Sequence, residues 1–181
     1  MKYLILVFCF ALLKPMQTEA APKDSITVYV FLLDACVICQ NYTLPLKELH
    51  AKYANDQVNF VGLFPNFTSK PPQIEAFKKK YQIPFELKTD YFKTKSKQFG
   101  ITVTPEVVVY NHTKEEVLYK GRIDNTYFRV GKRRTITTTS ELEDALEAIK
   151  NGQPIKVKET EAVGCFINYN EGPKIEKPKL K

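Results

Sequence analysis

The feature that most constrains this chain is an apolar, β-branched run that ends directly before two cysteines. Residues 26–33 read ITVYVFLL, and Cys36 and Cys39 follow as a C-x-x-C at the start of a helical pattern. The unpaired N–H groups and the positive dipole end of a helix N-terminus favour a thiolate over a thiol. The second sulfur lies about one helical turn away, so a disulfide can form with little backbone movement. This arrangement is that of dithiol redox chemistry.

The segments that follow predict an α/β fold. The predicted strands cover residues 26–33, 57–65, 85–87, 106–110 and 116–123. The predicted helices cover residues 37–53, 72–81, 91–99 and 140–152. Pro45 should kink the first helix, Asp90 should cap the third, and a capping box from Ser140 should start the last. Residues 124–137 are expected to form a polar loop. Strands that alternate with helices indicate a sheet with crossover connections.

Both ends of the chain are predicted to lie outside the domain. Residues 1–20 contain a positive charge at Lys2, then the apolar stretch YLILVFCFALL, and then small residues near position 20. This order is typical of a secretory signal peptide. The apolar stretch is about half the roughly 20 residues of a membrane helix. We therefore expect an exported protein, periplasmic or secreted, without stable membrane insertion after cleavage; an uncleaved anchor is the alternative. The domain would span residues 21–152, and residues 153–181 would be a partly disordered extension.

The charge of the chain does not indicate a nucleic-acid partner. The formal net charge is +7, but the lysines are scattered and no basic-aromatic stripe accompanies them. We interpret the charge as a solvated surface and expect no nucleic-acid binding.

The cysteine count indicates one working pair and one extra thiol. Removal of the signal leaves Cys36, Cys39 and Cys165, which is not a disulfide-dense scaffold. A structural zinc site needs four ligands, and His50 and His112 stand at no paired spacing. We therefore expect no metal and no cofactor. Two thiolates with one further soft ligand would suit Cu(I), so a copper-binding or copper-chaperone module without turnover is the alternative function.

The order of these parts resembles the thioredoxin fold, and within it the redoxin family, a peroxiredoxin-like branch with secreted bacterial members that carry a C-x-x-C. The resemblance covers roughly residues 26–167. It rests on five segments: CVIC at 36–39, TPE at 104–106, YKGRIDN at 119–125, GKRR at 131–134 and TEAVGC at 160–165. It implies a thioredoxin-like three-layer α/β/α sandwich with a central mixed sheet.

The resemblance implies an exported thiol–disulfide oxidoreductase that acts on protein substrates. Cys36, expected to be the more exposed sulfur, would attack, and Cys39 would resolve the mixed disulfide. Val37 and Ile38 carry no charge or imidazole, so nothing local should add to the helix dipole, and we expect a reducing pair. The partners would be protein thiols and disulfides and an upstream thiol electron donor.

Three further residues and one proline are candidates for the site. In the family a cis-proline faces the cysteines and the residue before it pairs with the substrate chain, which implies these roles for Pro105 and Thr104; a trans proline that opens an edge strand is the alternative. Glu106 would be a proton shuttle if buried near Cys39, or a solvated strand residue if it points outward. Cys165 would be a third redox thiol, a copper ligand or a small buried hydrophobe.

A polar cluster follows the predicted hairpin. Arg122, Asp124 and Asn125 would form either a polar rim beside the cysteines or a structural ion pair that closes the hairpin. Asp34 is interpreted as the turn residue that ends the first strand; a second carboxylate near the thiols is the alternative.

Peroxidase activity is the competing enzyme function. The peroxiredoxin site needs the pattern P-x-x-x-[TS]-x-x-C. The matching positions are Tyr29 and Leu33 before Cys36, and Leu32 and Cys36 before Cys39. No hydroxyl is supplied to orient a peroxide, so peroxidase activity is not expected.

Overall fold

The computed structural model describes residues 25–55 and 57–171 of the chain. The predicted signal peptide and the last ten residues of the predicted extension lie outside the described residues. In the described part, no helix is long and apolar enough to cross a membrane.

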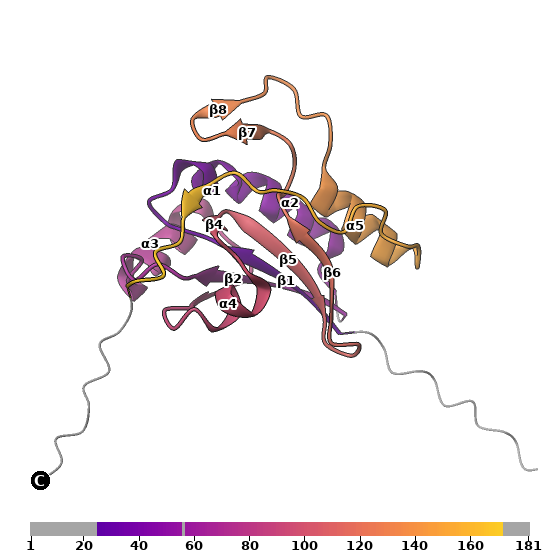
Figure 1. Cartoon of the computed structure of the whole chain (residues 1–181), viewed down its shortest axis with the longest axis horizontal. Helices are drawn as coiled ribbons and strands as arrows, with labels where there is room; N and C mark the ends of the chain where they lie inside the picture. Colours follow the sequence, from indigo (N-terminus) through magenta and orange to yellow (C-terminus); the bar gives the residue numbers. More distant parts are fainter. Residues whose placement is uncertain (1–24, 56, 172–181) are drawn as a thin grey trace, which may run out of the picture.

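A five-stranded mixed sheet forms the centre of the molecule, in the order β3-β2-β1-β5-β6 (Figure 1). β1 pairs in parallel with β2 and antiparallel with β5, so it is covered on both edges and both faces. This position explains why all of its residues are buried. The strands of the sheet are β1 (Ile26–Phe31), β2 (Val58–Phe64), β3 (Glu86–Thr89), β5 (Glu106–Asn111) and β6 (Glu116–Gly121).

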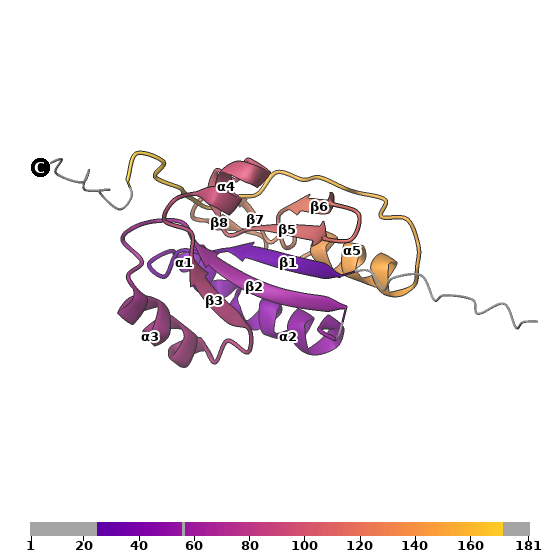
Figure 2. The same ribbon diagram turned by 90° about the horizontal axis from the view of Figure 1, so that it is seen from below.

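Helices cover both faces of the sheet, which confirms the predicted three-layer sandwich. On one face, Val28 and Val30 of β1 share a buried cluster with residues of α2 (Thr43–Tyr53), α3 (Pro71–Tyr81) and α5 (Glu141–Lys150). On the other face, Tyr29 and Phe31 pack with Phe99 of α4 (Thr94–Phe99). Figure 2 shows α4 on the side of the sheet opposite to α2 and α3. The alternation along β1 therefore divides the core into a large and a small cluster.

The predicted first helix is two helices, α1 (Val37–Asn41) and α2. Pro45 has no N–H to donate to the carbonyl of Asn41, and its ring would clash with that carbonyl. The chain therefore breaks at Tyr42, and Pro45 lies in the first turn of α2, where no N–H partner is needed. The sequence predicts a kink at Pro45, whereas the structure has a break in the helix before Pro45, at Tyr42.

One predicted helix start and one predicted capping box differ from the structure, whereas Ser140 is the N-cap of α5 as predicted. α4 begins at Thr94 instead of residue 91, although Asp90 still caps it by accepting the Ser96 N–H at 2.8 Å. The capping box at Ser140 is wrong, because the Ser140 side chain makes no capping hydrogen bond. The carboxylate of Glu143 instead accepts from the Lys52 ammonium at 2.8 Å.

Two short pairings lie outside the main sheet. The loop predicted over residues 124–137 contains a hairpin of β7 (Tyr127–Arg129) and β8 (Lys132–Arg133), which stands next to α1 (Figure 1). Near the C-terminus, β9 (Cys165–Phe166) pairs antiparallel with β4 (Val103–Thr104). Residues 153–171 thus run over the domain from α5, along the edge strand β6, to the start of α1.

Candidate active site

The C-x-x-C lies where β1 ends and α1 begins. Asp34 is in the turn between them, as interpreted from the sequence: its carbonyl accepts from the Gln40 amide at 2.8 Å and its carboxylate accepts from the Ser69 hydroxyl. Cys36 is the N-cap residue of α1, and Cys39 is inside that helix. The turn therefore fixes both sulfurs at the end of the central strand.

Both cysteines are buried, and Cys36, expected to be the more exposed sulfur, is so only by a small margin. Cys36 is 2% exposed and Cys39 is 0% exposed, whereas Cys165 is only partly buried. As a thiol, Cys36 donates to the Thr104 carbonyl oxygen at 3.6 Å; as a thiolate, it accepts from the Cys165 thiol. The cover over Cys36 is thus made by the β4–β9 pair, which brings together residues far apart in the sequence.

The surroundings of Cys36 favour its thiolate. Its pKa is lowered from 9.0 to about 5, first by a hydrogen bond from the Cys39 thiol, then by one from the Cys165 thiol and by the backbone N–H groups of Cys39 and Ile38, against the opposing effect of burial. The N–H groups are those of the helix start. The sequence identified this helix contribution but not the two neighbouring thiols that add to it.

The other two thiols hold their protons. Burial raises the pKa of Cys39 well above its ordinary value, and the negative Cys36 sulfur raises it further. Burial and then the hydrogen bond and charge of Cys36 raise the pKa of Cys165 to about 12. The lowered pKa of Cys36 and the raised pKa values of Cys39 and Cys165 thus favour one thiolate beside two protonated thiols.

Thr104 contacts all three cysteines. The Thr104–Pro105 bond is cis, as the resemblance implies. The Thr104 carbonyl faces the Cys36 sulfur, and its hydroxyl donates to the Cys165 carbonyl at 3.3 Å. The same hydroxyl is an alternative donor to the Cys39 sulfur, and that hydrogen bond lowers the pKa of Cys39. The sequence predicted a docking role for the backbone of Thr104 and missed the contacts of its hydroxyl.

Glu106 is buried but faces away from the cysteine cluster. It is 6% exposed, and burial raises the pKa of its carboxyl group. It pairs across the sheet with Phe31, which belongs to the smaller core cluster, whereas its neighbour Val107 belongs to the cluster that contains Cys36 and Cys39. Because paired residues share a face of a sheet, the structure does not bring Glu106 to the thiols.

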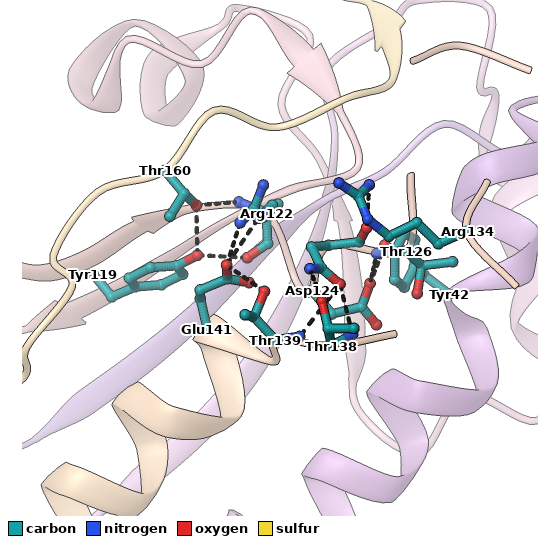
Figure 3. A network of polar contacts seen from close by, with 11 residues as sticks. Tyr42, Tyr119, Arg122, Asp124, Thr126, Arg134, Thr138, Thr139, Glu141 and Thr160 are labelled. Atoms are coloured by element: carbon teal, nitrogen blue, oxygen red, sulfur yellow. Dashed lines mark hydrogen bonds and ion pairs between the residues drawn. The ribbon is translucent and has the colours of Figure 1, made fainter. Parts of the chain in front are cut away.

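The polar cluster after β6 is structural. Arg122 forms an ion pair with Glu141 at the start of α5, and Asp124 accepts from the Tyr42 hydroxyl at 2.6 Å. The Asn125 amide donates to the Thr138 hydroxyl at 2.6 Å. Figure 3 shows Asp124 beside Tyr42, the residue before α2, and Thr139 beside Glu141 at the start of α5, so both ends of the loop of residues 124–139 are tied to the helical layer. These contacts support the interpretation as an ion-pair network that closes the hairpin.

The two histidines lie apart from the cysteines. His112 follows β5 at the end of the sheet where β1 begins, and its ring hydrogen-bonds to Thr27. His50 packs against the rings of Phe60 and Phe85. Over residues 25–55 and 57–171, no group of three or more His, Cys, Asp or Glu side chains is arranged to hold a metal ion.

Comparison with known proteins gives the family. Residues 13–138 match the AhpC/TSA family. The chain belongs to this family. No match was found among curated proteins. Family and fold are those of thiol-based redox proteins, which agrees with a buried thiolate and two neighbouring thiols.

Solved structures share the fold of this AhpC/TSA protein at low sequence identity. An uncharacterized conserved protein from Geobacillus kaustophilus has a TM-score of 0.69 and 22% identity, over 87% of this chain and 81% of that chain. A hypothetical protein from Sinorhizobium meliloti has a TM-score of 0.68 and 18% identity, over 80% of each chain. MTB dsbF, solved in mixed oxidized and reduced forms, has a TM-score of 0.51 and 20% identity, over 69% of this chain and 81% of that chain. These likenesses support the thioredoxin-like fold.

Proposed function

We propose that this AhpC/TSA protein is an exported thiol–disulfide oxidoreductase that exchanges disulfides with protein substrates through Cys36 and Cys39. The observation that carries the proposal is a thiolate at a helix start, with its pKa lowered to about 5, hydrogen-bonded to a buried thiol one turn away. A thiolate is the attacking species in disulfide exchange, and a neighbouring thiol completes the reaction.

The exchange has two steps. The Cys36 thiolate attacks one sulfur of a client disulfide, forms a mixed disulfide and releases the other client sulfur as a thiolate. Cys39 then gives its proton to that thiolate and attacks the Cys36 sulfur, which releases the second client sulfur. The client gains two electrons from the dithiol and one proton from Cys39, the second client thiolate takes its proton from solvent, and the protein holds a Cys36–Cys39 disulfide. An upstream thiol donor would restore the dithiol, and Thr104–Pro105 would dock the client chain beside Cys36.

The direction of exchange depends on how strongly the dithiol form is stabilised. The hydrogen bonds that lower the pKa of Cys36 stabilise the reduced protein. A stabilised reduced form makes a pair more oxidising. This observation points the opposite way from the reducing pair expected from Val37 and Ile38, so the potential has to be measured.

The alternatives have less support. Leu33 stands at the position where a peroxiredoxin supplies a hydroxyl before Cys36, so we propose no peroxidase activity. A copper-binding module would use the sulfurs of Cys36, Cys39 and Cys165 without turnover, and the titration below separates it from an oxidoreductase.

A redox titration tests the proposed function. The mature protein and its Cys165→Ser variant are equilibrated in glutathione and dithiothreitol buffers, and free thiols are counted by alkylation and mass. We expect Cys36 and Cys39 of the variant to lose reactivity together at one potential, and we expect the protein to accelerate reduction of insulin by dithiothreitol. Failure of the two cysteines to pair, or thiols masked until a copper chelator is added, would overturn the proposal.

A further inference from the structure

The C-terminal segment of residues 160–167, termed the strap, covers the attacking sulfur and carries a sulfur of its own. We propose that Cys165 is an internal exchange partner of Cys36, so that a Cys36–Cys165 disulfide alternates with Cys36–Cys39, and that the strap must leave before a client reaches Cys36. This inference rests on the proposed function and names the regulation of the same site. Three independent features of the strap support it.

The first feature is strand pairing beside the nucleophile. Cys165 is the register partner of Thr104, and Phe166 is the partner of Val103. The Ile167 N–H donates to the Thr102 carbonyl at 2.9 Å. The strap therefore pairs with β4, and the Thr104 carbonyl of β4 faces the Cys36 sulfur. A client peptide that presents a sulfur for exchange would lie in the same place.

The second feature is a close approach that only glycine permits. A Cβ atom on Gly164 would lie 2.0 Å from the Thr104 carbonyl oxygen and 3.0 Å from the Pro105 nitrogen. Real Cβ atoms do not approach backbone atoms so closely, so any other residue would push the strap away. Glycine at this position lets the next residue, Cys165, reach Cys36.

The third feature is that the strap is fixed on both sides of Cys165. On one side, the Thr160 hydroxyl bonds to the Tyr119 hydroxyl at 2.8 Å and accepts the Arg122 N–H at 3.1 Å. On the other side, the Asn168 N–H donates to the Asn66 side chain at 2.8 Å. These anchors hold Cys165 in contact with Cys36, which gives an intramolecular exchange a large advantage over a bimolecular one.

The exchange step balances within the protein. In the oxidised form, Cys165 loses its proton and attacks the Cys36 sulfur of the Cys36–Cys39 disulfide. The Cys36–Cys165 bond forms as the Cys36–Cys39 bond breaks, and Cys39 leaves as a thiolate that takes up the proton. No electrons enter or leave. Part of the raised pKa of Cys165 comes from the charge of the Cys36 thiolate, and that charge is absent in the disulfide.

The same contacts make the strap a barrier to clients. Because Cys36 is 2% exposed under the strap, a client sulfur reaches it only after β9 leaves β4. A Cys36–Cys165 disulfide would fasten the strap in place, and its reduction would release it. The protein would then be closed to clients when oxidised in this way and able to open when reduced.

A pair of cysteine variants separates this inference from the proposed function. The full mature chain is used as Cys39→Ser and as Cys165→Ser, each titrated with glutathione disulfide and mapped by alkylation and peptide mass. We expect a Cys36–Cys165 linked peptide in Cys39→Ser and a Cys36–Cys39 linked peptide in Cys165→Ser. Glutathione bound to Cys36 of Cys39→Ser, with Cys165 still open to alkylation, would overturn the inference and leave the proposed function intact. Absence of the Cys36–Cys39 link in Cys165→Ser would instead overturn the proposed function.

A glycine variant tests the cover directly. Gly164→Ala should displace the strap and raise the rate of Cys36 alkylation by iodoacetamide in the reduced protein about tenfold or more. Glu161→Ala, at an exposed position of the same strap, is the matched control and should leave the rate unchanged. Equal rates in Gly164→Ala and the wild type would show that the strap does not limit access to Cys36.

Discussion

Two segments of the molecule each deliver a thiol to Cys36, and they do so by different means. The turn after β1 brings Cys39 from a position within the same helix start, whereas the strap brings Cys165 through a strand pairing of segments far apart in the chain. The first arrangement is a consequence of local geometry and cannot be undone without unfolding α1. The second depends on contacts that can break while the domain stays folded.

The two segments also differ in how much apolar side chain they bury. α2 continues from the C-x-x-C helix and inserts Leu46, which is 0% exposed, into the large core cluster. The strap buries less apolar surface: Phe166 is 80% exposed, Ile167 is buried in the small core cluster, and Val163 and Cys165 are only partly buried against the large cluster. Hydrogen bonds at Thr160 and Ile167 add to these contacts. Segments with few buried apolar contacts open at a lower free energy than the core. We therefore expect the strap to open long before the turn.

The largest expected effect concerns the acidity of Cys36. The lowering of its pKa from 9.0 to about 5 increases the thiolate-to-thiol ratio roughly ten-thousand-fold at a given pH. Alkylation rate or thiolate absorbance against pH should give a midpoint near 5. Because the hydrogen bond from Cys39 is the larger cause, Cys39→Ala, which removes the donor, should raise the midpoint more than Cys165→Ala does. The reverse order would show that Cys165 is the stronger donor to Cys36.

The same shift predicts the pH dependence of stability. A lowered pKa in the folded state adds stability that is present above the unfolded value of 9.0 and is lost as pH falls towards 5. The raised pKa of Cys165, to about 12, works oppositely and removes stability as pH rises from 9.0 towards 12. In the reduced protein, the difference in unfolding free energy between the wild type and Cys36→Ser should rise between pH 5 and 9.

Loss of core packing under the turn should have the next largest effect. Leu46→Ala removes a fully buried side chain and should lower the free energy of unfolding by about 2–5 kcal/mol, measured by urea unfolding of the reduced protein. Leu44→Ala is the control, because Leu44 is 57% exposed on the same helix, and we expect a change within about 0.5 kcal/mol. Similar losses of unfolding free energy in the two variants would show that the buried and the exposed face of α2 contribute equally, which would contradict this prediction.

Loss of one anchor of the strap should have a smaller effect on stability and a specific effect on Cys36. Thr160→Val removes the hydroxyl that contacts Tyr119 and Arg122, which should cost about 1–2 kcal/mol. Alkylation of Cys36 should become faster, whereas Thr135→Val, in the exposed loop after β8, should change neither quantity. A stability loss without faster alkylation would mean that this anchor does not control the strap.

The smallest effect is expected at the surface between α2 and α5. Lys52 contacts Glu143 at 2.8 Å and Glu147 at 3.7 Å, and the side chains are largely exposed. Exposed ion pairs contribute little and are screened by salt. Lys52→Ala should therefore shift the urea midpoint only slightly at low salt and not at all at high salt; a salt-independent loss would argue against a purely electrostatic contact.

The order of elements and the local part of the site could be predicted from the sequence. The periodicity of residues 26–33 and the spacing of Cys36 and Cys39 are properties of neighbouring residues, and the structure follows them. The break at Tyr42 was predicted only as a kink, because the restriction from Pro45 acts on the carbonyl four residues before it.

The long-range part of the site could not be predicted. β4 and β9 have two residues each, too few to show a period, so nothing local placed Cys165 beside Cys36. The sequence also does not show on which face of the sheet Glu106 lies, because this depends on its register with Phe31 across the sheet. The available signal was Gly164 directly before a cysteine, since glycine often marks a close backbone approach.

The pairing of β4 with β9 also bears on how the protein behaves at high concentration. Among the described residues β4 pairs only with β9, so departure of the strap would leave a bare strand edge. Bare edges are templates for pairing with another chain and for aggregation. Self-association should thus depend on redox state: a molecule whose strap is fastened by Cys165 should stay monomeric at concentrations at which the reduced molecule begins to associate.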